Sequence, residues 1–199
     1  MPSVMSMMRR FRRDEGGTVM VEALLVLPML LWSYLALFVY WDAFRSLNTA
    51  QKAAYTISDT ISREMVSLSP AYIPGLRNMM QYLVHNDDTL VKLRVSSITY
   101  NEAALRFEVH WSRSPDGAFP ELTTATLQQF ADCNAATIKP GSCILPNMAD
   151  GDYVILVETS IDYEPAFNVG VNDQVLREFI VTRPRFLPKI CLTGVVCPI

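Results

Sequence analysis

The chain has 199 residues, half of them hydrophobic, and a formal net charge of −3 at pH 7. This length supports one membrane segment together with one compact domain and leaves little room for a second full domain. Four of the 17 Lys and Arg residues and three of the 20 Asp and Glu residues precede Asp42, so the rest of the chain has a net charge of −4. Such an acidic body has no electrostatic attraction for nucleic acid.

The N-terminal part combines a basic cluster with an uncharged apolar run. The run covers residues 23–41, which are 19 residues without a charge. As a helix it rises about 28 Å, close to the ~30 Å hydrocarbon core of a bilayer. It ends in Tyr40 and Trp41, which suit a membrane interface. The arginines in front of it are expected to keep the N-terminus in the cytoplasm, with a single pass through the inner membrane and a periplasmic C-terminal domain. The basic cluster consists of Arg9, Arg10, Arg12 and Arg13.

A possible cleavage signal lies before the apolar run, at Gly16, Gly17 and Thr18. In a secretory signal peptide the apolar region is shorter, about 7–15 residues, and the small-residue cleavage site follows it. Here the order is reversed, and Glu22 is the fifth residue counted from Thr18. This arrangement is similar to that of prepilins, whose leader is removed on the cytoplasmic side while the apolar helix is kept.

Within that group the chain resembles the TadE-like minor pilins (pseudopilins) of tight-adherence (Tad/Flp) systems. The resemblance is carried by GGTVMVEALLVLP, by the aromatic-rich span and by QKAAYTISDTISRE, over about residues 12–64. It implies removal of a leader, residues 1–17, by a prepilin peptidase that cuts between Gly17 and Thr18. It also implies that other Tad pilins and the pilus assembly platform are partners. Major Flp pilins usually carry an aromatic residue after the glutamate, so Ala23 favours the pseudopilin branch.

Glu22 is the one acid inside the apolar segment. A carboxylate just inside hydrocarbon costs about 3 kcal/mol on insertion scales, which makes it a functional candidate. After cleavage Thr18 carries an α-amino group with an ordinary pKa near 8, one helical turn from Glu22. Glu22 can pair with its own N-terminus or with that of a neighbouring subunit, and the resemblance implies that the second pairing sets the axial register of the filament. Alternatively, Glu22 lies in the head-group layer and complements the positive end of the helix dipole.

One long helix is expected to start in the membrane and continue outside it. No Gly or Pro interrupts residues 29–69, and apolar residues recur there every three or four positions. We therefore expect a transmembrane part at residues 18–41 and an exported extension at residues 42–69, stopped by Pro70. Pro28, where the resemblance also expects a proline, is predicted to kink the span.

The remaining residues, 70–199, are predicted to form an α+β domain. Strands are expected from the alternation of apolar and polar residues, and the first two make an antiparallel hairpin around Asn101 and Glu102. The fold class is therefore a long N-terminal helix packed on an antiparallel sheet of about four strands, which is a pilin-like layout. The expected strands lie at residues 91–96, 105–111, 157–163 and 175–183, with a short helix at residues 74–83 and a turn at residues 85–88.

All four cysteines fall in the exported part, as expected in an oxidising compartment. Three pairings are possible, and local closure is favoured: Cys133 with Cys143 and Cys191 with Cys197. The first pair would pin a surface insertion at residues 112–151 that includes a short helix around residues 122–131. The nine and five residues between paired cysteines do not fit the spacing of common zinc knuckles, so no metal is expected.

No catalytic motif is recognisable in the chain. Phosphate-binding glycine loops, H-E-x-x-H and G-x-S-x-G are absent from the sequence. The two histidines are His85 and His110, and His110 is expected to be solvated on the polar face of its strand. Asp87 and Asp88 lack the spacing of a calcium loop and are interpreted as solvated turn residues. The sequence therefore predicts a protein that is not an enzyme and that needs no cofactor.

Two other functions remain open from the sequence. The first is a pseudopilin of another type IV filament machine, such as type II secretion, which has the same kind of leader. The second is an uncleaved single-pass envelope protein with an exported binding or enzymatic domain.

Overall fold

The computed structural model describes residues 8–9, 17–84, 91–117, 119–131, 145–167 and 169–197. The chain divides into two compact units. The first contains Met1–Ala43 and Pro165–Asn172, and the second contains Phe44–Glu164 and Asp173–Ile199. Helix α2 (Thr18–Ser62) contributes to both units.

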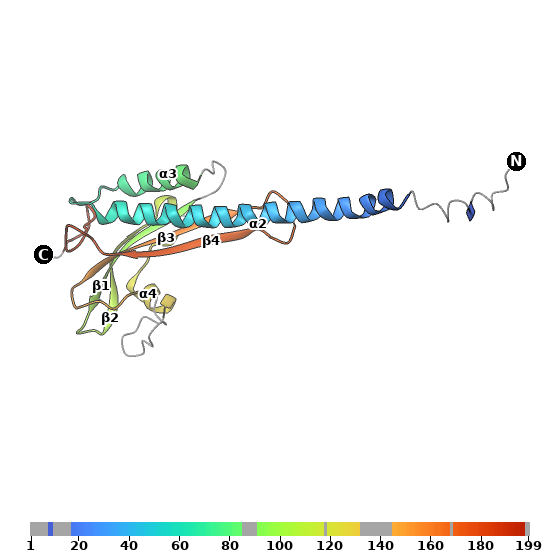
Figure 1. The fold of residues 1–199 in the computed structure, drawn as a ribbon. Helices are drawn as coiled ribbons and strands as arrows, with labels where there is room; N and C mark the ends of the chain where they lie inside the picture. The colour runs from blue at the N-terminus through green and yellow to red at the C-terminus, as the bar shows by residue number, and fades with distance from the viewer. Residues whose placement is uncertain are drawn as a thin grey trace. The chain divides into compact units, whose positions relative to one another are not determined.

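A four-stranded antiparallel sheet forms the centre of the second unit. Its strands follow the order β2-β1-β3-β4 (Figure 1). All four overlap the predicted strands, and β1 and β2 form the expected hairpin. However, β1 continues beyond the predicted end at residue 96, and β3 begins before the predicted start at residue 157. Together with helix α2 the sheet confirms the α+β fold class. The strands are β1 (Lys92–Asn101), β2 (Arg106–Arg113), β3 (Tyr153–Tyr163) and β4 (Gln174–Thr182).

The part of α2 that lies in the second unit packs on one face of this sheet. Its buried residues recur every three or four positions, as the sequence predicted, and most of them are small. The hydroxyls of Ser58 and Thr182 are hydrogen-bonded between the helix and β4. Burial raises the pKa of Glu178 on β4, and a hydrogen bond with Gln51 of α2 opposes that shift. The buried helix residues are Ala50, Ala53, Ala54, Ile57, Ser58, Ile61 and Ser62.

Helix α2 ends at Ser62, so the predicted extension to residue 69 is wrong at its end. The last two apolar residues of the predicted stripe do not continue the helix. Met65 is 61% exposed, and Leu68 forms a parallel bridge with the C-terminal segment. The Leu68 amide donates to the Cys191 carbonyl at 2.8 Å, and the Thr193 amide donates to the Leu68 carbonyl at 2.9 Å. This pairing between distant segments replaces the helical hydrogen bonds that the local pattern favoured.

Helix α3 (Tyr72–Val84) confirms the short helix expected at residues 74–83. It buries one apolar face through Ile73, Leu76 and Met80. At its start the Tyr72 hydroxyl donates a 2.5 Å hydrogen bond to Glu64, and burial together with this carboxylate raises the pKa of Tyr72. The turn expected at residues 85–88 lies outside the described residues.

A β-bulge in β2 changes which residues share a face of the sheet. Ser97 pairs with Trp111, whereas Ile98 pairs with Val109, so the strand carries one extra residue, His110. Successive residues of β1 point to opposite faces, and their partners do so too. Trp111 therefore lies on the face opposite Val109. Simple alternation along residues 105–111 predicts that Val109 and Trp111 share a face. That expectation is wrong, because the alternation of apolar and polar residues does not reveal a bulge.

The bulge also gives His110 contacts that the sequence did not predict. Its Nε2 lies 3.0 Å from the carbonyl oxygen of Val196. Its ring meets that of Tyr153 edge-on, with ring centroids 5.7 Å apart. On the same segment Trp111 Nε1 donates to the carbonyl of Ile190 at 2.9 Å. His110 is thus held by the C-terminal segment, which corrects the expectation of a solvated strand residue.

The described part of residues 112–151 forms a layer on the second face of the sheet. After the turn η2 (Pro115–Gly117), helix α4 (Thr124–Ala131) begins where expected, capped by Thr123, whose Oγ1 accepts a 3.2 Å hydrogen bond from the Thr126 amide. Figure 1 shows α4 and α2 on opposite sides of the strands. Apolar residues of the described part complete a core, so this part is not confined to the surface. That core contains Ile98, Phe107, Leu122, Leu127, Leu145, Val154 and Leu156. The disulfide-pinned insertion over residues 112–151 stays a prediction.

A buried ion pair lies beneath this layer. Arg94 and Glu158 are directly opposite on β1 and β3, and two hydrogen bonds of 2.6 Å join the guanidinium to the carboxylate. Arg94 Nη1 also donates to the Pro120 carbonyl at 2.6 Å, and its Cζ lies 5.2 Å from the Phe119 ring centroid. The sequence placed both charges on the polar face of their strands. That face is covered here, and the pair holds the covering segment.

The β1–β2 turn contains a strained residue, Leu105, with φ at 49°. This left-handed conformation costs a residue with a Cβ about 1–2 kcal/mol, and Gly adopts it freely. We expect Leu105→Gly to raise the free energy of unfolding by roughly 0.5–1 kcal/mol. Urea unfolding of the full chain in a mild detergent measures the change. Ala103→Gly in the same turn is the control and is expected not to stabilise, so equal effects of the two variants would contradict the strain.

Candidate functional site

The first unit carries an apolar helical surface that the protein itself does not cover. Residues 19–34 of α2 are all exposed, so the apolar surface extends around this part of the helix. Among the described residues, α2 is the one helix long and apolar enough to cross a membrane, with a mean hydropathy of 2.1 and 6% of its most apolar window buried. The exposed apolar residues include Val19, Met20, Val21, Leu24, Leu25, Val26, Leu27, Met29, Leu30, Leu31 and Trp32.

The predicted cleavage site coincides with the start of this helix. Gly17 is exposed and directly precedes α2, which begins at Thr18. A Cβ built on Gly17 would meet no atom within 4 Å, so the fold does not require a glycine at this position. Gly16 lies outside the described residues.

Glu22 places a carboxylate on the exposed helix, about 6 Å along the axis from Thr18. It is exposed to the surroundings of the helix. The described part of the chain offers its carboxylate no hydrogen-bond or ion-pair partner. In hydrocarbon such a group is costly unless a cation or a proton neutralises it. The geometry therefore leaves Glu22 available for a partner supplied from outside this chain or by a new N-terminus.

Pro28 lies inside α2, and the helix continues on both sides of it. A proline lacks the N–H that would bond the carbonyl of Leu24, so one helical hydrogen bond is absent here. The kink stays a prediction.

The far end of the apolar segment is covered by a loop that the sequence analysis did not single out. This loop, Pro165–Asn172, connects β3 to β4 and belongs to the same unit as the helix. The rings of Phe38 and Phe167 meet edge-on with centroids 6.5 Å apart, and Val39 is buried. One available signal was that the loop is uncharged, but alternation and helical periodicity do not indicate its helix contact.

The disulfide between Cys191 and Cys197 has the pairing expected from the sequence, with Cα atoms 5.8 Å apart. It closes a short loop whose Leu192 is buried and pairs with Leu68. The disulfide thus stabilises the C-terminal loop, and this loop pairs with the segment between α2 and α3 through Leu68. Cys133 and Cys143 lie outside the described residues.

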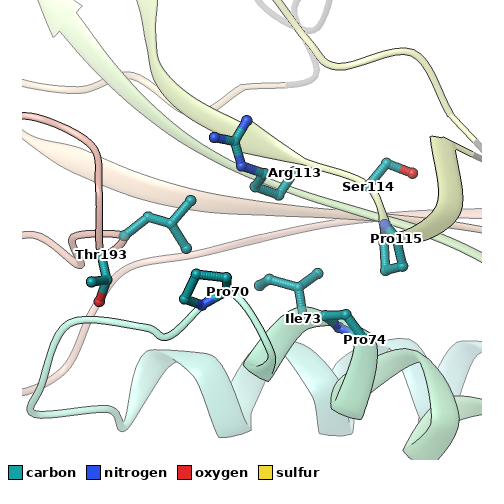
Figure 2. A pocket seen from close by; sticks show the side chains of 8 residues that line it. Pro70, Ile73, Pro74, Arg113, Ser114, Pro115 and Thr193 are labelled. Carbon is teal, nitrogen blue, oxygen red and sulfur yellow. The ribbon is translucent and has the colours of Figure 1, made fainter.

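The described residues of the second unit line hollows, of which two bear on the site. The first, about 200 Å³, lies between the start of α3, the end of β2 and the disulfide loop, and Figure 2 shows its lining of prolines, Ile73 and Arg113. Its polar groups already have partners, because Arg113 pairs with Glu121 at 2.7 Å and Ser114 donates to the Leu93 carbonyl at 3.0 Å. The second, about 430 Å³, borders the Arg94–Glu158 pair.

The described residues contain no group of three or more His, Cys, Asp or Glu side chains placed to hold a metal ion. No protein-family model, curated protein or solved structure matches this chain. The features that a functional proposal can use are therefore the exposed apolar part of α2 and the positions of Gly17, Thr18 and Glu22.

Proposed function

We propose that this protein is a TadE-like minor pilin that serves the biogenesis of a Tad/Flp adhesive pilus or the secretion associated with it. The observation that carries the proposal is the exposed apolar helix that starts at Thr18, directly after Gly17, with Glu22 as its one acid before Trp41. A soluble protein does not leave such a helix uncovered, because its apolar surface would be in water.

In this proposal the chain inserts with its arginine-rich leader in the cytoplasm and its α+β domain in the periplasm. A prepilin peptidase in the inner membrane removes the leader, and the retained helix stores the protein in the bilayer. Other Tad pilins and the assembly platform then act on it. The protein primes, caps or regulates the thin pilus, or it supports maturation of the major pilin.

Glu22 has a defined chemical role in this sequence of events. Cleavage creates an α-amino group on Thr18 that is mostly cationic at neutral pH. Side chains on a helix lean toward its N-terminus, so Glu22 reaches toward the new charge within one subunit. In an assembly, the N-terminus of a neighbouring subunit replaces this partner. The exchange lets subunits associate without leaving a carboxylate unpaired in hydrocarbon.

The alternative of an uncleaved envelope protein has one observation in its favour, the hollow of about 430 Å³ beside Arg94 and Glu158. A binding domain would offer such a hollow to a ligand. A pseudopilin of another filament machine shares the processed leader and differs in its neighbouring genes.

Processing is tested on the protein extracted from membranes. N-terminal sequencing and intact mass are expected to give a chain that starts at Thr18, and Gly17→Leu is expected to leave the leader attached. Gly75→Ala is a matched control, because a Cβ at Gly75 in α3 likewise meets no atom within 4 Å. An intact Met1, or any start other than Thr18 in the unsubstituted protein, contradicts the proposal.

A further inference from the structure

The β3–β4 connection differs in composition from the strands around it. Its eight residues, Pro165–Asn172, read PAFNVGVN and carry no charge. An acid stands on either side, Glu164 before the loop and Asp173 after it. An uncharged segment between two acids is suited to an apolar or interfacial environment, with its charged flanks in water.

This loop fits closely against the end of the apolar helix. Phe167 meets Phe38 with ring centroids 6.5 Å apart. Gly170 has φ at +80°, and a Cβ there would lie 3.4 Å from the Tyr40 hydroxyl. Both the left-handed backbone and the close approach favour glycine at this point. Phe167 nevertheless remains 47% exposed, so the helix covers only part of its ring.

The position of the contact along the helix corresponds to a membrane boundary. Phe38 lies about 30 Å along the axis from Thr18, which is the thickness of the hydrocarbon core. It lies about 4.5 Å before Trp41, the last residue of the uncharged run. Counted from either end of the span, the loop is therefore at the level where hydrocarbon gives way to head groups.

A loop at this level has its backbone polar groups to satisfy. Among the described residues the Val169 amide donates to the Phe167 carbonyl at 3.0 Å. An amide or carbonyl of an irregular loop without a protein partner needs water or a lipid head group. The hydrocarbon core offers no hydrogen-bond partner to these groups, whereas the head-group layer offers water and polar lipid atoms. An apolar ring can also be buried there to a depth of about 5–10 Å.

We propose that the β3–β4 connection is a second membrane-contacting element, which lies in the lipid head-group layer on the exported side with Phe167 directed into the acyl boundary. The partner is the bilayer surface itself, continuous with the lipid around α2. This inference rests on the part of the proposed function that puts α2 across the membrane, and it is independent of cleavage and assembly.

The test attaches an environment-sensitive fluorophore to single cysteines in the full chain, reconstituted in phosphatidylethanolamine and phosphatidylglycerol vesicles. Phe167→Cys reports on the loop, and Leu30→Cys reports on the middle of the span, where the side chain is 64% exposed. Ala103→Cys in the β1–β2 turn is the control, because β1 and β3 are antiparallel and the two connections leave the sheet at opposite ends. The unsubstituted protein, labelled without reductant, provides the blank.

The label at position 167 is expected to shift its emission to the blue and to lose most of its intensity to a quencher carried near the head-group end of a lipid acyl chain. The label at position 30 is expected to respond most to a mid-chain quencher, and the label at position 103 to neither. A quenched position 30 with an unquenched position 167 overturns the inference and leaves the proposed function intact. If position 30 is also unquenched, α2 does not cross the bilayer, and both the inference and the proposed function are contradicted.

Discussion

Glu158→Ala is expected to lower the free energy of unfolding by about 3–5 kcal/mol, because it leaves a buried guanidinium without its counter-charge. The side chains of Arg94 and Glu158 are 8% and 10% exposed, so water does not readily replace the lost carboxylate. Arg94 would keep only its hydrogen bond to Pro120 and its contact with Phe119. Urea unfolding of the full chain in a mild detergent, followed by near-ultraviolet circular dichroism, measures the effect.

Two variants separate a buried-charge effect from a simple loss of packing. Glu121→Ala removes the partner of Arg113 in an exposed pair, with side chains 46% and 55% exposed, and is expected to cost less than about 1 kcal/mol. The double variant Arg94→Met with Glu158→Leu removes both charges and is expected to recover most of the stability lost in Glu158→Ala. A double variant as unstable as the single one would contradict the charge argument.

Under the proposed function, Glu22→Ala is expected to leave membrane insertion intact and to impair incorporation of the protein or piliation. The substitution removes the one acid of the span, so insertion becomes easier. It also removes the group that would pair with a neighbouring N-terminus. A pair worth about 1.4 kcal/mol shifts an association equilibrium tenfold, so incorporation or piliation is expected to fall by about tenfold or more.

Membrane fractionation, N-terminal sequencing and counting of pili on cells measure the Glu22→Ala phenotype. Ser33→Ala is the matched control, since Ser33 is a polar residue on the same exposed helix but carries no charge. Wild-type piliation in Glu22→Ala would contradict the pairing role and would support the alternative, in which Glu22 only complements the positive end of the helix dipole.

Most of the secondary structure could be predicted from the sequence. Alternation located β1, β2 and β3, although β1 and β3 are longer than predicted, and the three-to-four spacing located α3 and the buried face of α2 through Ile57 and Ile61. These signals are local, because a side chain's face on a strand or helix depends only on its position within that element. The same locality explains the error at the end of α2, where Leu68 continued the helical spacing yet pairs with Leu192.

The covered second face of the sheet shows a different limit of prediction. Arg94 and Glu158 alternate with apolar residues and therefore indicated a solvated face. The residues next to Arg94 and Glu158 in the sequence do not indicate that the segment around Phe119 and Leu122 covers these two side chains. Burial here depends on contacts between residues far apart in the chain, and the same holds for Trp111 beyond the bulge.

The sequence by itself determined the apolar helix, the α+β fold class and the candidate residues Gly17, Thr18 and Glu22, because the composition of a segment and the spacing of its apolar residues depend on neighbouring residues alone. The processing and assembly roles of those three residues stay predictions. Only the tertiary structure decided where α2 ends, that Arg94 and Glu158 form a buried pair, and that the uncharged loop around Phe167 meets the end of the span. These outcomes depend on which segments, far apart in the chain, pack on one another and exclude water, and a local sequence pattern does not contain this information.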